Sequence, residues 1–430
     1  MKLEGNNYGF DTLMIHAGHQ PDPVTHSVCP PIYQTTAYEF ESADHARALF
    51  ELKESGNIYT RIMNPTVDTL ERRVAALDGG VGALCMASGH AAIFATMLNL
   101  AKEGDEIVSS FNIYGGAINL LGVTLKNIGI QVKFVNADNP EEWENAVTDK
   151  TRAFFVEVVG NPNANVADLE AIAGIAHQHG IPLIADSTFT TPYLCKAIEF
   201  GADIVIHSAT KFLGGHGTSM AGVVVDSGSF RFEGNPRFPQ YNEPDVSYHG
   251  VVFARDCANA AFITRLRVLM LRDLGACLSP FNAFMILQGI ETLSLRMQRH
   301  CENTQKVAEY LCANENVSFV NYPGLTGSKY HALMKKQMPK GAGAVFTFGL
   351  KGGREAGVGF IDSLRLVGNV ANVGDVRTLV IHPASTTHSQ LSDEQLREVG
   401  ISPDTVRLSI GLEDVNDIIA DLEAAIQKAR

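Results

Sequence analysis

The sequence predicts an α/β protein: a large domain with a mostly parallel sheet flanked by helices, a smaller C-terminal α/β domain and an extended N-terminal arm. Apolar strand patterns alternate with helical patterns from about residue 80 to residue 225, as in a sheet covered on both faces. A second, shorter set of such patterns follows a long helical stretch after residue 280. Residues 1–58 instead contain proline-rich turns that favour extended backbone.

These patterns predict three parts with limits at 1–58 for the arm, 59–276 for the large domain and 277–430 for the smaller one. A chain of 430 residues is long enough for two or three domains. Its 45% hydrophobic and 19% charged residues are typical of an ordinary globular protein. The formal net charge of -13 argues against nucleic-acid and anionic-membrane partners, because those partners attract basic patches.

The cysteines and the N-terminus indicate a cytoplasmic protein. The seven cysteines form no Cys-x-x-Cys pair and their number is odd, which favours reduced thiols over disulfides or a zinc site. The first residues lack the apolar core of a signal peptide, and no apolar run approaches the ~18 residues of a membrane helix. The fourteen histidines show no metal-ligand spacing, so we expect no metal site.

Capping residues define the first helices. Ser42 is a candidate N-cap for a short helix near 42–52, in an arm that we expect to pack on a neighbouring subunit. Asn64 and Pro65 are suited to the cap and the first position of a helix. Apolar residues then repeat at helical spacing until Gly79, which predicts the end of that helix.

Two turns in this region are suited to an anion. Tyr59 and Arg61 precede the second helix, and an arginine there can bind a phosphate in bidentate fashion. A short apolar strand breaks at Ser88-Gly89-His90, from which a helix runs to Leu100. The amides and the dipole of such a helix attract anions. A surface arginine and an ordinary strand–helix turn are the alternatives.

Candidate ligands follow the predicted strands of the large domain. We expect these strands at residues 83–87, 106–109, 132–135, 153–159, 181–185, 203–207 and 223–225, with further helices at 139–147 and 169–180. Ligands of parallel sheets collect at the carboxyl ends of the strands. Polar residues lie just past such ends at Ser88, Tyr114, Asn161, Asp186 and 208–211.

The stretch around Lys211 carries the most specific chemistry. Lys211 lies just past a buried strand and before a glycine-rich turn, where desolvation lowers the pKa of an amine and makes it nucleophilic. Ser208 and Thr210 add hydroxyls that can hold phosphate oxygens. The stretch therefore predicts a Schiff base with pyridoxal phosphate (PLP), a phosphorylated aldehyde. A solvated loop lysine is the alternative.

Three further residues fit such a site. Tyr114, between a strand end and two glycines, can lie over a planar ring or simply fill the core. Asp186 follows an apolar run and needs a positive partner, such as a protonated pyridine nitrogen, unless it only caps Thr188. Arg407 lies inside an apolar strand and needs a carboxylate from the protein or from a substrate.

The rest of the chain predicts fewer and simpler elements. Residues 226–257 form an irregular, aromatic-rich loop. We expect helices over 258–276 and, continuously, over 280–313, strands near 317–322, 344–348 and 405–409, and a closing helix over 414–428.

Short motifs along nearly the whole chain carry a family resemblance. They are Tyr59-Thr-Arg61-Ile-Met-Asn-Pro-Thr66, Ala87-Ser-Gly-His-Ala-Ala92, Tyr114-Gly-Gly116, Gly160-Asn-Pro162, Ala185-Asp-Ser-Thr-Phe189, His207-Ser-Ala-Thr-Lys211, Ser279-Pro-Phe-Asn-Ala283, His382-Pro-Ala-Ser-Thr-Thr-His388 and Arg407-Leu-Ser-Ile-Gly-Leu-Glu-Asp414. In this order they resemble the PLP-dependent enzymes of cysteine and methionine metabolism, most closely the O-acetylhomoserine sulfhydrylase branch. The resemblance implies an aspartate-aminotransferase-like large domain, the fold type I of PLP enzymes.

The resemblance also implies roles for individual residues. Lys211 holds the cofactor and moves protons, Asp186 pairs with the pyridine nitrogen, and Tyr114 stacks on the ring. Arg407 holds the substrate α-carboxylate, with Asn372 beside it. Further contacts are implied to the phosphate for Ser88, Gly89, His90, Ser208 and Thr210, and to the phenolic oxygen for Asn161. From a neighbouring subunit, Tyr59 and Arg61 are implied to reach the phosphate, and Tyr59 also the substrate.

The implied activity is that of a transferase of methionine biosynthesis. Sulfide or methanethiol replaces the acetate of O-acetyl-L-homoserine to give homocysteine or methionine, in a homotetramer built as a dimer of dimers. Methionine γ-lyase and cystathionine γ-synthase are the alternatives, although Gly116 stands where γ-lyases carry a cysteine. A nicotinamide-dependent dehydrogenase is a more distant alternative, which the absence of a Gly-x-Gly-x-x-Gly motif after a strand disfavours. A non-enzymatic α/β binding protein is the remaining alternative. The acyl group, the thiol donor, the balance of replacement and elimination, and any roles of His216 and Tyr248 stay open.

Overall fold

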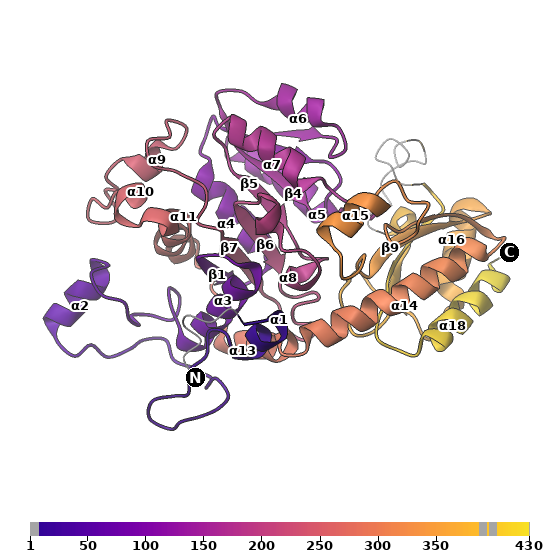
Figure 1. Cartoon of the computed structure of the whole chain (residues 1–430), viewed down its shortest axis with the longest axis horizontal. Coiled ribbons are helices and arrows are strands. Elements are labelled where there is room, and N and C mark those ends of the chain that lie inside the picture. The colour runs from indigo at the N-terminus through magenta and orange to yellow at the C-terminus, as the bar shows by residue number, and fades with distance from the viewer. Residues whose placement is uncertain (1–7, 387–393, 395–401, 430) are drawn as a thin grey trace.

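Two sheets joined by one long helix organise the chain. A computed structural model describes residues 8–386, 394 and 402–429. Figure 1 shows the larger sheet at the centre, the smaller one beside it, and α14 (Leu293–Ala313) crossing from one to the other. The strands of the larger sheet all come from residues 82–226, and those of the smaller sheet from residues 317–409. The domain limits that we expect are compatible with this division and stay a prediction.

The larger sheet has seven strands in the order β1-β7-β6-β5-β4-β2-β3. Only β7 is antiparallel to its neighbours, so the predicted mostly parallel sheet is confirmed. Its strands are β1 (Gly82–Met86), β2 (Glu106–Ser110), β3 (Gln131–Val135), β4 (Thr151–Glu157), β5 (Leu183–Asp186), β6 (Ile204–Ser208) and β7 (Gly222–Asp226).

Helices bury both faces of this sheet. Alternate strand residues point to opposite sides, so that Cys85 and Met86 of β1 belong to two different hydrophobic clusters. One cluster includes α3 (Pro65–Asp78), α6 (Pro140–Ala146) and α7 (Leu169–Gln178). The other includes α4 (Gly89–Leu100), the π-helical turn η1 (Leu120–Leu125) and α11 (Ala261–Arg265). Because both faces are covered, the strands can be almost wholly apolar.

The predicted capping residues act as caps. The Asn64 side chain accepts a hydrogen bond from the amide of Thr66 at 3.0 Å, and Gly79 ends α3 with a φ of 84°. The Ser88 hydroxyl likewise accepts from the Ala91 amide at 3.1 Å and starts α4. In the arm, Ser42 caps α2 (Ala43–Phe50), which stands away from the body of the molecule (Figure 1).

The smaller sheet has five strands in the order β10-β11-β12-β9-β8. They are β8 (Val317–Asn321), β9 (Val345–Leu350), β10 (Gly368–Asn369), β11 (Leu379–Ile381) and β12 (Thr405–Ser409). It packs on α14 and α16 (Gly353–Ser363), and α18 (Val415–Lys428) packs on these two helices. In the part of the chain that the structure describes, no helix is long and apolar enough to cross a membrane.

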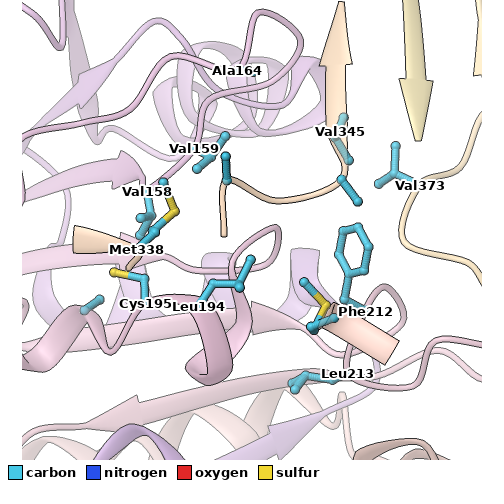
Figure 2. Close-up of a cluster of buried hydrophobic side chains, with 14 of the residues drawn as sticks. Val158, Val159, Ala164, Leu194, Cys195, Phe212, Leu213, Met338, Val345 and Val373 are labelled. Atoms are coloured by element: carbon cyan, nitrogen blue, oxygen red, sulfur yellow. The ribbon is translucent and has the colours of Figure 1, made fainter. Parts of the chain in front are cut away.

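The two domains share an apolar core at the carboxyl edge of the larger sheet. Figure 2 shows Phe212 of the turn after β6 pointing toward Val345 of β9 and Val373. Val159, just past β4, is buried in the same hydrophobic cluster. The smaller domain therefore closes over the edge at which the candidate ligands lie.

Two long helices predicted from the sequence are interrupted. The helix predicted over 280–313 is wrong as a single element, because α13 (Pro280–Ile290) ends before α14 begins at Leu293. The stretch predicted as a helix over 258–276 contains a 3-10 turn (Ala258–Ala260), α11, the π-helical η4 (Leu266–Leu271) and α12 (Arg272–Leu274). Helices that the sequence did not predict include α1 (Phe10–His16), which has no side-chain cap, and α16, which contains three glycines.

Candidate active site

A cavity of about 270 Å³ lies where the carboxyl ends of β1, β2, β4, β5 and β6 meet the smaller domain. Most of the residues predicted from the sequence line it together. The lining includes Ser88, Gly89, His90, Tyr114, Asn161, Asp186, Ser208, Thr210, Lys211, Asn372 and Arg407. The topology explains this convergence, because parallel strands end at the same edge of the sheet.

Lys211 is the only lysine that lines this cavity among the described residues. Burial lowers the pKa of its ammonium group, and the nearby positive charge of Arg407 lowers that pKa further. Its Nζ donates a hydrogen bond to the side-chain oxygen of Asn372 from the smaller domain. The amine is therefore held between the two domains and favours its unprotonated, nucleophilic form more than an exposed lysine does.

Two buried carboxylates stand side by side opposite this amine. Glu157 and Asp186 are register partners at the ends of β4 and β5, and burial raises the pKa of both carboxyl groups. Asp186 accepts the amide of Thr188 at 2.9 Å, so its capping role and its place in the cavity coexist. Among the described residues, no lysine or arginine forms an ion pair with either carboxylate. A cationic ligand beside the pair would therefore favour its ionised form.

The sequence did not predict a role for Glu157. Its carboxylate accepts the backbone amides of Tyr114 at 2.8 Å and of Asn161 at 3.1 Å, so it fixes two predicted site residues at once. A signal existed, because Glu157 ends an apolar strand in the same way as Asp186 does. A second unpredicted group is the cavity wall formed by Phe189, Met220, Ala371 and Val373.

Arg407 is a partly buried cation that lines the same cavity. Burial lowers the pKa of its guanidinium to about 10, which still leaves it charged at neutral pH. Its Nη1 donates to the Asn161 side-chain oxygen at 3.1 Å, and its Nη2 donates to the Asn372 carbonyl at 3.3 Å. Within the described ranges no carboxylate pairs with it. The protein therefore leaves the carboxylate partner to be supplied by a ligand.

The start of α4 forms an anion-binding end of the cavity. The first amides of a helix have no intrahelical acceptor, and the helix dipole adds positive potential there. A side chain at Gly89 would place its Cβ 2.7 Å from the Ser208 Cβ, so only glycine allows this close approach. Thr210 is less available than predicted, because its hydroxyl donates to the Ala221 carbonyl at 3.2 Å.

Tyr114 presents a half-exposed ring at the mouth of the cavity. The ring packs edge-on against His90, with 5.6 Å between the centroids. A Cβ at Gly116 would lie 2.5 Å from Tyr114 Cε1, so the glycine makes room for this ring position. The interpretation of Tyr114 as a core residue is wrong, since 49% of its surface is exposed.

Two predicted residues lie outside the cavity of their own chain. Arg61 donates to the Arg272 carbonyl at 3.1 Å, with its guanidinium 5.5 Å from the centre of the Tyr59 ring. Neither residue lines the cavity. Their predicted contact with a neighbouring subunit stays a prediction.

The remaining open residues also lie elsewhere. His216 does not line the cavity, and Tyr248 lines a separate depression of about 470 Å³ beside α3 and η4. His388, at the end of the motif that starts at His382, falls outside the described residues. The described residues contain no group of three or more His, Cys, Asp or Glu side chains that could hold a metal ion.

The donor set fits pyridoxal phosphate. An amine with a lowered pKa can form a Schiff base with its aldehyde, and a carboxylate that no lysine or arginine of the described residues pairs with can face a protonated pyridine nitrogen. The N-terminus of α4 and the Ser208 hydroxyl suit its phosphate. Arg407 is left for a second, carboxylate-bearing molecule.

Comparison with known proteins supports this assignment. The sequence model of the family described as Cys/Met metabolism PLP-dependent enzyme matches residues 11–427. The chain is 51% identical over 422 residues to a protein of Fusarium oxysporum named as a sulfhydrylase, covering 98% of each chain. It is 52% identical over 419 residues to the O-acetyl-L-homoserine sulfhydrylase 1 of Thermus thermophilus, covering 97% of this chain and 99% of that protein.

A solved structure has the same fold. A protein of Campylobacter jejuni described as an O-acetylhomoserine (thiol)-lyase superposes with a TM-score of 0.94 at 42% identity, covering 98% of this chain and 100% of that chain. That structure contains N'-pyridoxyl-lysine-5'-monophosphate. The predicted fold class is confirmed by this likeness.

The raised pKa of Asp186 predicts how the protein without cofactor responds to pH. The folded state binds this proton more tightly than the unfolded state, so ionisation of Asp186 destabilises the fold as pH rises above ~4. We expect Asp186→Asn to raise the thermal midpoint of the cofactor-free protein by a few degrees at pH 8, and by less at pH 5. Added pyridoxal phosphate should stabilise the variant less than the natural protein.

Asp44→Asn is the matched control, because the Asp44 side chain is exposed in the arm. It should leave both midpoints unchanged. A lower midpoint for cofactor-free Asp186→Asn at pH 8 would show that the protein itself pairs this carboxylate.

Proposed function

Because the chain belongs to the family of Cys/Met metabolism PLP-dependent enzymes, we propose that it catalyses γ-replacement on O-acetyl-L-homoserine. Sulfide and O-acetyl-L-homoserine give homocysteine and acetate, and methanethiol in place of sulfide gives methionine and acetate. The names of the full-length relatives support this reaction and the acetyl group. The observation that carries the proposal is the meeting of Lys211, Asp186 and Arg407 at one cavity.

Residues of both domains hold the cofactor in this proposal. When bound to Lys211, PLP supplies an electron sink that acidifies the substrate Cα–H. Asp186 faces the pyridine nitrogen and keeps its proton in place, and Tyr114 covers the ring. The phosphate lies at the start of α4, with donors from Ser88, Gly89, His90, Ser208 and Thr210.

Lys211 acts as the proton carrier. Burial lowers the pKa of this amine and so favours its unprotonated form, in which Nζ can accept the proton from Cα of the substrate, pass it to the electron-rich cofactor and then accept one from Cβ. Loss of the Cβ proton allows acetate to leave from Cγ, where the thiol then adds. The Asn372 side-chain oxygen, which accepts from Nζ, orients the amine between these two carbon atoms.

Arg407 orients the substrate. Its guanidinium binds the α-carboxylate, which neutralises a buried charge that lacks a protein carboxylate among the described residues. Asn161, fixed by Glu157 and bonded to Arg407, lies between the amino-acid substrate and the phenolic oxygen of the cofactor. The apolar wall that includes Phe189 and Met220 excludes water from the side chain of the substrate.

The working assembly is a homotetramer of two dimers, with each site shared between subunits. The arm supports this proposal, because α2 stands away from its own chain and Val24 and Val28 are largely exposed. Tyr59 and Arg61 then reach the phosphate of the neighbouring subunit, and Tyr59 also reaches its substrate. A cytoplasmic location is supported by the seven cysteines, all of which are free thiols.

Product analysis tests the proposed reaction. The PLP-loaded protein is incubated with O-acetyl-L-homoserine, with and without sulfide, and acetate, homocysteine and 2-oxobutyrate are quantified. Homocysteine should equal acetate, and both should require sulfide. Release of 2-oxobutyrate without sulfide would instead favour a γ-lyase. Lys211→Ala should lose both the product and the visible absorbance of the Schiff base.

Removal of the Arg407 charge should weaken substrate binding. We expect Arg407→Gln to raise KM for O-acetyl-L-homoserine on the order of 100-fold, because the substrate carboxylate loses its charged partner. The matched control is Arg377→Gln, an exposed arginine of the same domain paired with Asp375. An unchanged KM in Arg407→Gln would refute the assignment of the carboxylate site.

Mixed assemblies test the shared site. Lys211→Ala and Arg61→Ala are each expected to be nearly inactive, but a hybrid of the two should regain activity, since one of its sites combines an intact Lys211 with the partner's Arg61. A hybrid of Lys211→Ala and Asp186→Asn should stay inactive, because both residues line the cavity of the same chain. Equal inactivity of both hybrids would mean that Arg61 serves its own subunit.

A further inference from the structure

Arg296 is a second buried arginine without an acidic partner. It belongs to the first turn of α14, and only 5% of its surface is exposed. Burial lowers the pKa of its guanidinium to about 10, so the group is charged at neutral pH. In the described part of the chain no carboxylate lies within ion-pair distance of it. A buried cation of this kind destabilises a fold unless other groups solvate it.

Main-chain carbonyls of two separate segments solvate this cation. Nη1 donates to the Phe212 carbonyl at 2.7 Å, and Nη2 donates to the Leu213 carbonyl at 3.1 Å. Nη2 also donates to the carbonyl of Gly289, in the last turn of α13, at 2.7 Å. Carbonyls at the end of a helix carry partial negative charge. The guanidinium therefore joins the end of α13 to the turn over residues 209–214, which contains Lys211.

Glycines make the space for this contact. A Cβ at Gly289 would lie 2.2 Å from the Gly214 carbonyl oxygen, so α13 and the lysine turn touch through their backbones. Gly215 has a φ of 73°, and a Cβ there would lie 2.2 Å from Arg296 Nη1. Side chains at these positions would exclude the guanidinium.

The residue after the lysine is also held by its side chain. Phe212 is fully buried, and its ring packs edge-on against His300 of α14 with 5.2 Å between the centroids. Figure 2 shows the ring pointing toward Val373 and Val345 of the smaller domain. Two residues of α14 thus hold Phe212, which follows Lys211: Arg296 binds its carbonyl and His300 packs against its ring.

We propose that Arg296 is a positioning residue, which sets the place of the Lys211 amine by holding the carbonyls of the next two residues. The inference rests on the proposed role of Lys211. Proton transfer to and from two carbon atoms needs an amine placed closely, and an error of about 1 Å can lower a rate on the order of 100-fold. Arg296 contacts neither the cavity nor its ligands, and it acts through the backbone of the lysine turn.

The test uses two variants and one matched control. Arg296→Lys keeps the positive charge but loses the planar group that reaches three carbonyls. If Arg296→Lys does not fold, because its buried charge lacks partners, Arg296→Gln is the second variant. It removes the charge and with it the desolvation penalty. The control is Arg265→Lys, a buried arginine that donates to the Asn99 carbonyl at 3.0 Å, in the hydrophobic cluster on the other face of the sheet.

Each cofactor-free protein is mixed with pyridoxal phosphate, the rate at which the Schiff-base absorbance appears is recorded, and kcat and KM are then measured. We expect either Arg296 variant to form the Schiff base at least 10-fold more slowly and to lose about 100-fold in kcat, with KM changed less than three-fold. Arg265→Lys should match the natural protein in all three quantities.

Two failures can be told apart. If the natural protein forms no Schiff base, the proposed function fails. If it does, and a folded Arg296 variant matches Arg265→Lys in Schiff-base rate and kcat, the positioning role is overturned. A rise in KM with kcat unchanged would also overturn it, since that result would place Arg296 in substrate binding.

Discussion

Uncompensated charge at the carboxyl edge of the larger sheet is the constraint on which the rest of the structure depends. Two carboxyl groups, of Glu157 and Asp186, the amine of Lys211 and the guanidinium of Arg407 lie around one cavity. No described contact joins them into ion pairs. Burying charged groups without partners destabilises the fold. A ligand that brings a cation to the carboxyl groups and an anion to Arg407 would remove this cost.

The fold supplies these charges from two directions. Five strand ends of the larger sheet bring the amine, the carboxylates and the start of α4 to one edge, and β12 of the smaller sheet brings Arg407 against them. The hydrophobic core around Phe212 and Val345 joins the two parts at this edge. Because low polarity strengthens each electrostatic contact, the closure by the smaller domain is part of the chemistry.

Cationic arginines serve two different purposes here. The guanidinium of Arg407 lines the cavity, where a ligand carboxylate can reach it. The guanidinium of Arg296 instead donates hydrogen bonds to main-chain carbonyls of the protein. One of these carbonyls belongs to Gly289, in the last turn of α13. It accepts from Arg296 at 2.7 Å and from the Thr292 amide at 3.3 Å. The Arg296 guanidinium thus joins the end of α13 to the turn that contains Lys211.

The sequence alone determined the local elements and most of the site. Caps such as Asn64 and Ser88 act over a few residues, and a polar residue after an apolar strand marks a sheet edge, so Lys211, Asp186 and Arg407 could all be predicted. Only the tertiary structure decided two further points: Glu157 fixes two backbone amides, and Tyr59 and Arg61 lie outside the cavity of their own chain. The physical reason is distance along the chain. Each of these outcomes depends on groups that are remote in sequence or, for Tyr59 and Arg61, on whether a second subunit is present, and no local pattern encodes such contacts.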